Sequence, residues 1–259
     1  MATSPDHPHP IPEASGWRRI ALVETGSTND IALQAALQGD PGQLWVTAGR
    51  QLAGRGRRGR NWVSEPGNLY ASALVVTTAR PEAMGVLPLV AGLALHEAIA
   101  RLVPVLAPGL SLKWPNDLLL NGAKLSGILL EGQPLDNGRH AVIVGFGVNL
   151  AHGPDEAAYP VATLATHGPA PAPDSAFAAL AASFQAELAR WDEGRGTGAV
   201  VARWRHAAAG IGKPIRVNLP DRTLDGRFAD VDERGYLLLD QPGGTIRIAA
   251  GDVFLMNQS

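Results

Sequence analysis

The spacing of apolar and polar residues predicts strands alternating with helices over the first 150 residues. Short apolar runs bounded by Gly, Pro, Asn or Asp are typical of buried strands, whereas longer runs at helical spacing indicate helices. The predicted strands are 17–23, 44–48, 69–77 and 141–150. The mostly apolar stretch 86–103 predicts a long helix packed on the sheet.

Two polar segments punctuate this pattern. Ser27-Thr28-Asn29-Asp30 follows the first strand, and its short side chains are typical of a helix N-terminus that exposes hydroxyl, amide and backbone N–H groups. Asn121-Gly122 lies between two apolar runs and predicts a two-residue hairpin turn, because both turn positions need positive φ. Lys124 then begins the return strand.

The pattern changes in the last third of the chain. A helix capped by Asp174 and a shorter one over 199–208 precede four or five short strands from Lys213 onward. These strands predict a small β-barrel. We therefore expect a disordered tail over 1–16, a catalytic domain over 17–209 and a barrel over 210–259.

Composition indicates an ordinary cytoplasmic protein. The chain has 259 residues, of which 46% are hydrophobic, and a formal net charge of -2. No signal peptide is evident, and no run approaches the roughly 20 apolar residues of a membrane-spanning helix. Cysteine is absent, which excludes thioester intermediates and cysteine-ligated metals.

One segment, 51–62, concentrates basic residues among glycines as QLAGRGRRGRNW. Glycines let the backbone approach a ligand closely, and guanidinium groups pair with carboxylate or phosphate. A solvated basic loop or a nonspecific nucleic-acid patch has the same composition. Because the rest of the chain is not basic, the pattern favours a small anion.

Lysine is rare in this chain, occurring only at Lys113, Lys124 and Lys213. Two of the three flank the predicted hairpin. A compact ammonium suits bridging a carboxylate and a phosphate, although strand-end lysines are often merely solvated.

Four motifs, in this order, together resemble the biotin protein ligases (biotin–[acetyl-CoA-carboxylase] ligases). They are Ser27-Thr28-Asn29, the glycine-arginine segment 54–60, KWPND at 113–117 followed by KLSGILLE at 124–131, and GFGVN at 145–149. The resemblance spans about residues 17–259 and fits the short form, without an N-terminal DNA-binding domain. It implies an α+β fold: a mixed β-sheet with helices packed on one face, like class II synthetases, and then an SH3-like barrel.

The implied activity has two steps. Biotin and ATP, with Mg²⁺, form biotinyl-5'-AMP, and a lysine of the biotin carboxyl carrier domain of an acyl-CoA carboxylase then receives the biotinyl group. By the same resemblance, the biotin-binding residues are Ser27, Thr28, Asn29, Gln51, Arg55, Gly56, Arg57 and Lys124. The residues on the ATP side are Arg57, Arg60, Trp62, Lys113, Asn116 and Asn149.

The chemistry also follows from charge. A carboxylate that attacks the α-phosphorus brings like charges together, so positioned cations must neutralise them. We expect Lys124 and Arg57 to stabilise this transition state, and Asp117 to orient a cation or help to hold Mg²⁺. No other metal is expected, since the histidines show no ligand spacing.

Two alternatives stay open at this point. A related ligase for lipoate or octanoate would share an apolar pocket with a cationic mouth, although the KWPND and KLSGILLE motifs favour biotin. A nonenzymatic nucleic-acid-binding module would use the basic loop and the barrel. We expect no specific DNA binding, no membrane association, and a monomer or homodimer.

Overall fold

The computed structural model describes residues 11–12, 16–154, 157 and 159–256. Of the predicted disordered tail, 1–10 and 13–15 lie outside the described residues, and Ile11–Pro12 pairs with Arg18 and Arg19 as a short strand. The chain forms two compact units, each built from two segments: 1–78 with 126–178, and 79–125 with 179–259.

The first unit is a mixed sheet. Its strands are β1 (Ile11–Pro12), β2 (Arg18–Thr25), β3 (Leu44–Gln51), β4 (Leu69–Thr77), β8 (His140–Val148) and β7 (Ala123–Pro134), in this spatial order. Of β7, residues 126–134 belong to this unit. β2 and β3 are parallel, whereas β3, β4, β8 and β7 pair antiparallel in turn. The mixed sheet predicted from the resemblance is therefore confirmed.

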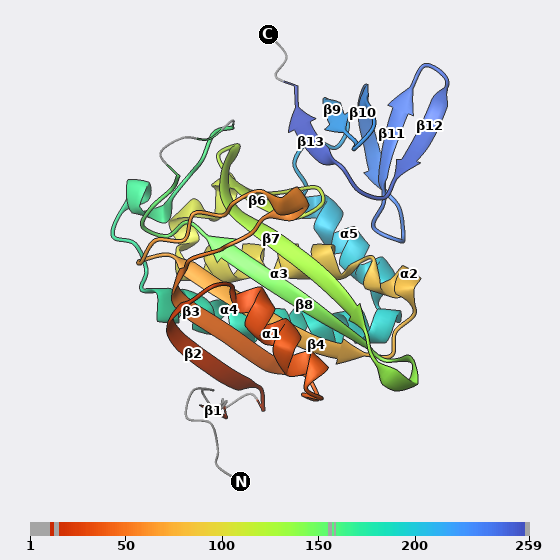
Figure 1. The fold of residues 1–259 in the computed structure, drawn as a ribbon. Helices are drawn as coiled ribbons and strands as arrows, with labels where there is room; N and C mark the ends of the chain where they lie inside the picture. The colour runs from red at the N-terminus through yellow and green to blue at the C-terminus, as the bar shows by residue number, and fades with distance from the viewer. Residues whose placement is uncertain (1–10, 13–15, 155–156, 158, 257–259) are drawn as a thin grey trace. The chain divides into compact units, whose positions relative to one another are not determined.

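Helix α1 (Thr28–Leu37) packs on β3, β4 and β8 (Figure 1). Its Ala32 and Ala36 lie in one buried cluster with Leu44 and Val46. Trp45, between those two strand residues, points to the other face because side chains alternate along a strand. There it meets Phe177 of α4 (Pro173–Trp191), with ring centroids 5.4 Å apart. Helical residues thus contact both faces of this unit's sheet.

The second unit combines helices with two antiparallel groups of strands. Its helices are α2 (Pro81–Met84), α3 (Leu87–Leu102) and α5 (Thr197–Ala207), together with residues 179–191 of α4. Strands β5 (Leu110–Lys113) and β6 (Asp117–Leu120) form a hairpin on which α3 packs. The segment Pro81–Leu102 is long and apolar enough to cross a membrane by composition alone, but most of it is buried, as in a core helix.

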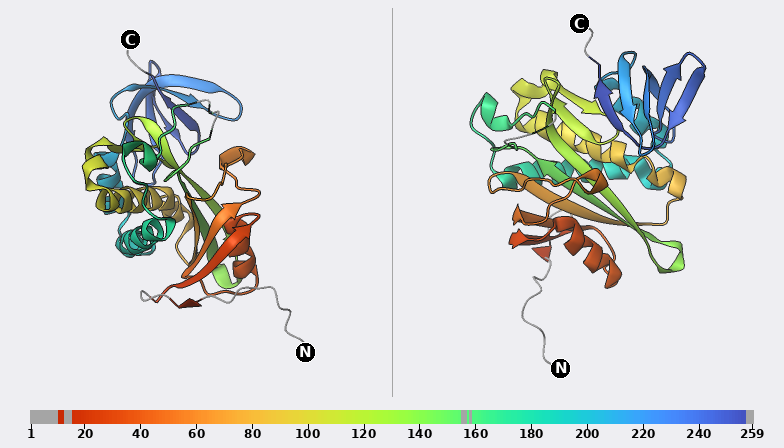
Figure 2. Two further views of the ribbon diagram at one scale, coloured as in Figure 1. Left: turned by 90° about the vertical axis from the view of Figure 1, so that its left-hand side faces the viewer. Right: turned by 45° about the horizontal axis from the view of Figure 1, so that its top comes forward.

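The C-terminal strands form a sheet of their own, drawn in blue in Figure 2. They are β9 (Pro214–Asn218), β10 (Thr223–Val231), β11 (Leu237–Gln241), β12 (Gly244–Ile248) and β13 (Asp252–Leu255). All their pairings are antiparallel. This sheet agrees with the predicted SH3-like barrel.

Five short 3₁₀ helices connect the described elements, and one of them lies in a predicted site segment. They are Arg57–Gly59, Pro104–Gly109, Asp136–Gly138, Leu164–His167 and Asp192–Gly194. Arg57–Gly59 lies inside the glycine-arginine segment, where Arg58 has φ 57° and Gly59 φ 70°. Two successive left-handed residues turn the loop sharply, which glycine tolerates at the second position.

Candidate active site

The predicted polar turn is the N-terminus of α1. Ser27 is its N-cap, and the Ser27 hydroxyl accepts from the backbone N–H of Asp30 at 3.4 Å. Ser27, Thr28 and Asn29 are each at most 5% exposed. Buried polar groups need partners, so the neighbours of these side chains determine their orientation.

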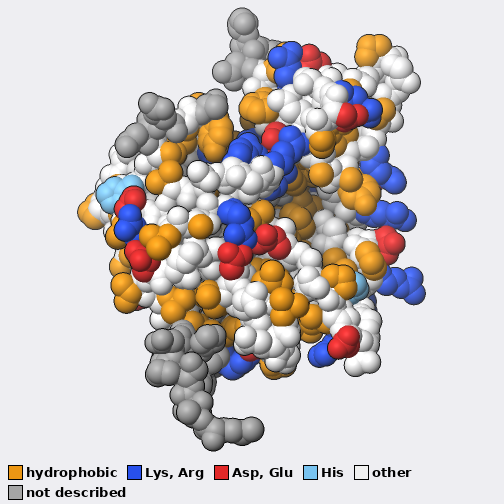
Figure 3. Space-filling view, viewed as in Figure 1, with side chains coloured by type: hydrophobic (Ala, Val, Ile, Leu, Met, Phe, Trp, Pro, Cys, Tyr) orange, Lys and Arg blue, Asp and Glu red, His pale blue; other side chains and the backbone are white. Residues whose placement is uncertain are grey.

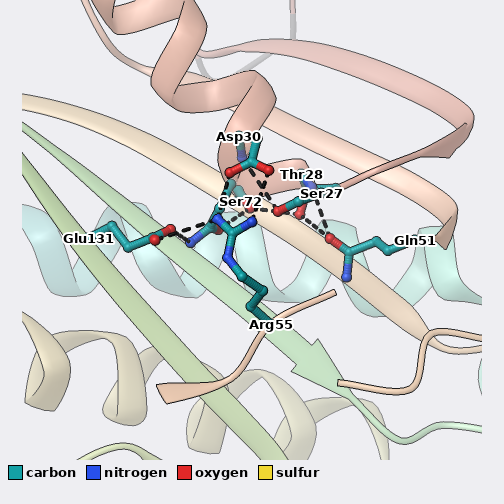
Figure 4. A network of polar contacts seen from close by, with 8 residues as sticks. Ser27, Thr28, Asp30, Gln51, Arg55, Ser72 and Glu131 are labelled. Atoms are coloured by element: carbon teal, nitrogen blue, oxygen red, sulfur yellow. Dashed lines mark hydrogen bonds and ion pairs between the residues drawn. The ribbon is translucent and has the colours of Figure 1, made fainter. Parts of the chain in front are cut away.

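A chain of short contacts links these residues to three strands (Figure 4). Gln51 Oε1 of β3 lies 2.9 Å from Thr28 N and 3.0 Å from Thr28 Oγ1. Ser72 Oγ of β4 lies 2.7 Å from Thr28 Oγ1 and 2.6 Å from Asn29 Oδ1. Asn29 Nδ2 donates to Glu131 Oε2 of β7 at 2.6 Å. We call these five residues the polar chain.

Arg55 connects the glycine-arginine loop to the N-terminus of α1 and to Glu131 of the polar chain. It donates twice to Asp30, at 2.9 and 2.5 Å, and lies 3.6 Å from Glu131 (Figure 4). The hydrogen bond from Arg55 holds the pKa of Asp30 below its ordinary value. Arg55 itself has a raised pKa, chiefly through Asp30. This two-pronged pair fixes the first residue of the arginine cluster against α1.

The rest of the loop folds back on itself. Gly56 N donates to Arg60 O at 2.7 Å, and Arg55 bridges to Asn61. Arg57 is half-buried and Arg60 is exposed. On the face shown in Figure 3, basic side chains occur in separate groups, several with acidic side chains beside them. That distribution fits a local anion site better than a continuous nucleic-acid surface.

Gly145 and Gly147 of β8 are positions where other side chains lie directly on the strand. A Cβ added to Gly145 would come within 2.3 Å of Asn29 Oδ1, and one on Gly147 within 2.4 Å of the Trp62 ring. Side chains of the same unit, Asn29 and Trp62, thus approach these glycines closely. Both glycines help to shape the site.

The KWPND motif forms the β5–β6 turn in the second unit. The hairpin register places Lys113 directly opposite Asp117. Asp117 Oδ2 lies 2.9 Å from Lys113 Nζ, and Oδ1 lies 2.8 Å from Lys124 Nζ. We call these three residues the lysine clamp. Asn121 and Gly122 have φ 51° and 79°, as the predicted turn before Lys124 requires.

Asp117 keeps its charge although it is buried. Desolvation raises the pKa of this carboxyl, but Lys124 and Lys113 together outweigh burial, and its pKa lies below the ordinary value. The two ammonium groups are therefore held side by side by one shared carboxylate. Because each carboxylate oxygen accepts from one lysine, Asp117 is placed to orient these two cations.

The predicted residues thus fall into two groups. In the first unit, Ser27, Thr28, Asn29, Gln51 and Arg55 share one set of polar contacts. That unit also holds Gly56, Arg57, Arg60, Trp62 and Asn149. Asn149 is buried and donates to Ala162 O at 3.3 Å, so its amide also holds a loop. Lys113, Asn116, Asp117 and Lys124 belong to the second unit.

Sequence reasoning missed Ser72, Glu131 and Asp30. Ser72 is a polar residue in the middle of the largely apolar strand LYASALVVT, and it is fully buried. Glu131 ends the KLSGILLE motif, and Asp30 lies three residues after Ser27. An uncompensated polar residue in a buried strand is a usable signal, because it demands a partner. Among the described residues, no group of three or more His, Asp or Glu has a metal-binding arrangement.

Comparison with known proteins gives the family. Residues 23–149 match the model of the biotin/lipoate A/B protein ligase family, and 210–256 match that of the biotin protein ligase C terminal domain. The biotin–[acetyl-CoA-carboxylase] ligase of Paracoccus denitrificans is 41% identical over 90% of this chain and 98% of that protein. The one from Mycobacterium tuberculosis is 36% identical over 94% and 91%.

A solved structure gives the same answer. The biotin protein ligase from Aquifex aeolicus, in complex with biotin and ATP, superposes with a TM-score of 0.76 at 26% identity, covering 93% of this chain and 99% of that one. The chain therefore belongs to the biotin/lipoate A/B protein ligase family and, within it, to the biotin protein ligases. The resemblance stated from the four motifs is confirmed.

Proposed function

We propose that this chain activates biotin with ATP to biotinyl-5'-AMP and transfers the biotinyl group to a lysine of the biotin carboxyl carrier domain of a carboxylase. The observation that carries the proposal is the lysine clamp, in which one buried carboxylate holds two ammonium groups at 2.8 and 2.9 Å. Paired compact cations suit a reaction between a carboxylate and a phosphate.

The polar chain is the site for the ureido ring of biotin. A cyclic urea offers two N–H donors and one carbonyl acceptor, which hydroxyl, amide and main-chain groups complement. Ser27, Thr28, Asn29 and Gln51 supply these groups, and the backbone of Arg55 and Gly56 completes the pocket. Arg57 and Lys124 act toward the carboxyl end of the ligand.

Adenylation needs no enzyme nucleophile. A biotin carboxylate oxygen attacks the α-phosphorus, the bond from that phosphorus to the bridging oxygen breaks, and pyrophosphate leaves. Lys124 and Arg57 neutralise charge on the phosphate oxygens, and Asp117 keeps Lys124 and Lys113 oriented. Mg²⁺ accompanies ATP as its counter-ion.

The remaining predicted residues serve the nucleotide. Arg60, Lys113 and Asn116 act near the phosphates and ribose, and Trp62 offers a ring for the adenine. Asn149 belongs to the same side, where its contact with Ala162 O steadies it. In the second step a neutral lysine amine of the carrier domain attacks the acyl carbon, and AMP leaves. We place this reaction in the cytoplasm and expect a monomer or homodimer.

ATP–pyrophosphate exchange with biotin, lipoate or no acid tests the adenylation step. The proposal predicts exchange that depends on biotin and is far slower with lipoate. Equal exchange with lipoate would assign the chain to lipoate chemistry, and no exchange with either acid would overturn the ligase activity. Transfer of labelled biotin to an isolated carrier domain, but not to its Lys→Arg variant, tests the second step.

A further inference from the structure

The polar chain has a fixed hydrogen-bond direction, and Glu131 sets it. A carboxylate has acceptors only, and Glu131 is also paired with Arg55 at 3.6 Å. The Asn29 atom 2.6 Å from Glu131 must therefore be the Nδ2 donor. Since the two ends of an amide are opposed, Asn29 presents its Oδ1 acceptor to Ser72.

The next two contacts follow from counting protons. Ser72 has one hydroxyl proton and lies within 2.7 Å of two oxygens, Asn29 Oδ1 and Thr28 Oγ1. Asn29 Oδ1 has no proton to give, so the Ser72 proton goes there. Ser72 Oγ at 2.7 Å and Gln51 Oε1 at 3.0 Å then compete for the single proton of Thr28, and the shorter contact assigns this proton to Ser72.

This assignment leaves two acceptors facing each other. The Thr28 hydroxyl already donates its proton to Ser72, and Gln51 Oε1 already accepts from Thr28 N at 2.9 Å. With the Thr28 proton assigned to Ser72, the two oxygens, 3.0 Å apart, have no proton between them. An N–H donor from a ligand that reaches both oxygens would remove this unfavourable pairing.

We propose that Glu131 is a positioning residue that makes Thr28 and Gln51 a paired acceptor for one ureido N–H of biotin. The inference rests on the proposed function, because it concerns recognition of biotin at the same site. Without the carboxylate, the Asn29 amide can reverse. Ser72 would then donate to Thr28, Thr28 would donate to Gln51, and the acceptor pair would disappear.

The test compares biotin with its two mono-N-methyl ureido derivatives by calorimetry, in wild type and in Glu131→Gln. The amide of glutamine keeps the size of the side chain but can donate as well as accept. In the wild type we expect one of the two methylations to weaken binding strongly. In E131Q we expect that penalty to shrink about tenfold, with weaker binding of biotin itself.

Two further variants distinguish an effect on hydrogen-bond direction from the simple loss of an ion pair. Glu24→Gln is the matched control. It removes the charge of a carboxylate that pairs with an arginine at a similar distance, Arg50 at 3.5 Å, but Glu24 is not part of the polar chain. E24Q should keep the wild-type methylation penalty. Ser72→Ala cuts the chain between Glu131 and Thr28, so S72A and S72A/E131Q should show the same penalty.

The outcomes distinguish this inference from the proposed function. An unchanged methylation penalty in E131Q, or equal weakening of biotin and both derivatives, would overturn the role of Glu131 while leaving biotin recognition intact. A wild type that fails to bind biotin would instead overturn the proposed function. A further effect of E131Q in the S72A background would show that Glu131 acts by another route.

Discussion

The polar chain and the lysine clamp keep polar groups buried by different means. In the polar chain, contacts of 2.6 to 3.0 Å pass from Glu131 through neutral amides and hydroxyls, so each group has one required direction. In the lysine clamp, a single carboxylate balances two positive charges. Directional hydrogen bonds select the shape of a ligand, whereas compact charges stabilise a changing charge distribution. We therefore expect variants of the first to affect binding and variants of the second to affect rate.

The largest effect is expected from Lys124→Ala. Removal of one positioned donor to a transition-state oxygen costs about 10²–10³-fold in rate. We expect the maximal rate of pyrophosphate exchange to fall by about that factor, with a smaller change in the KM for biotin. Lys213→Ala is the control, because Lys213 is an exposed lysine at the start of the barrel. A near-normal rate in K124A would contradict the role of the lysine clamp.

Asp117→Asn separates the charge of the clamp from its shape. Loss of one partner of a buried ion pair costs about 3–5 kcal/mol, so D117N should lower the free energy of unfolding by about that amount at neutral pH. The pKa of Asp117 is lowered in the folded protein, so its contribution is complete above the unfolded value of about 3.9 and is lost as the pH falls through the folded value.

Urea denaturation of wild type and D117N at a series of pH values checks this sign. The difference between the two proteins should be constant above about pH 5 and should shrink below about pH 4. A difference that grows on acidification would mean that Asp117 is protonated, not ionised, in the folded protein.

Ser72→Ala should disturb the polar chain. It leaves Asn29 Oδ1 without its donor, which costs about 1–3 kcal/mol of stability, and lets Thr28 donate to Gln51, so we expect the KM for biotin to rise about tenfold. Ser183→Ala is the matched control: Ser183 is 1% exposed, yet its hydroxyl makes no hydrogen bond to any residue that the structure describes. Equal effects of the two variants on the KM for biotin would contradict the proposal that the polar chain binds biotin.

Gly145→Ala and Gly147→Ala test the approach of Asn29 and Trp62 to β8. A Cβ at 2.3 to 2.4 Å from those side chains forces them to move, with an expected cost of about 1–3 kcal/mol in thermal or urea unfolding. Gly132→Ala on β7 meets nothing within 4 Å and should be tolerated. Trp62 fluorescence should change in G147A but stay constant in G132A.

The smallest effect is expected from Asp30→Asn. Asp30 and Arg55 are 47% and 36% exposed, so their ion pair contributes less than about 1 kcal/mol to stability. Asp225→Asn, which breaks the similarly exposed pair with Arg216, should cost as little. Only D30N should raise the KM for biotin, by about threefold, because it releases the loop from α1. Equal KM values would show that Arg55 does not position the loop.

The sequence predicted most of the fold because each element has a local cause. Ser27 caps α1, Asn121 and Gly122 make the turn, and the apolar run over Leu69–Thr77 is β4 as expected. Asp174, expected to be the N-cap of its helix, lies instead in the first turn, because the helix begins at Pro173, a residue that suits a first helical position. Boundaries shift by a residue or two because helix and strand ends are only weakly determined locally.

The site was less predictable because its partners come from distant parts of the chain. Asn29 and Glu131 are separated by 102 positions, and Thr28 and Ser72 by 44. No local pattern contains such pairs. The motifs identified Lys113, Asp117 and Lys124 together because they are close in sequence: the β5–β6 register joins Lys113 to Asp117, and Lys124 follows the next turn at the start of β7. Contacts that depend on the order of strands in the sheet require the structure.

The most direct test of this comparison is the rate of ATP–pyrophosphate exchange as a function of biotin concentration for S72A and K124A, measured side by side with wild type. We predict that saturating biotin restores S72A to nearly the wild-type rate, whereas K124A stays slow at every biotin concentration. The reverse result, with K124A restored by biotin and S72A slow at saturation, would contradict the assignment of recognition to the polar chain and of chemistry to the lysine clamp.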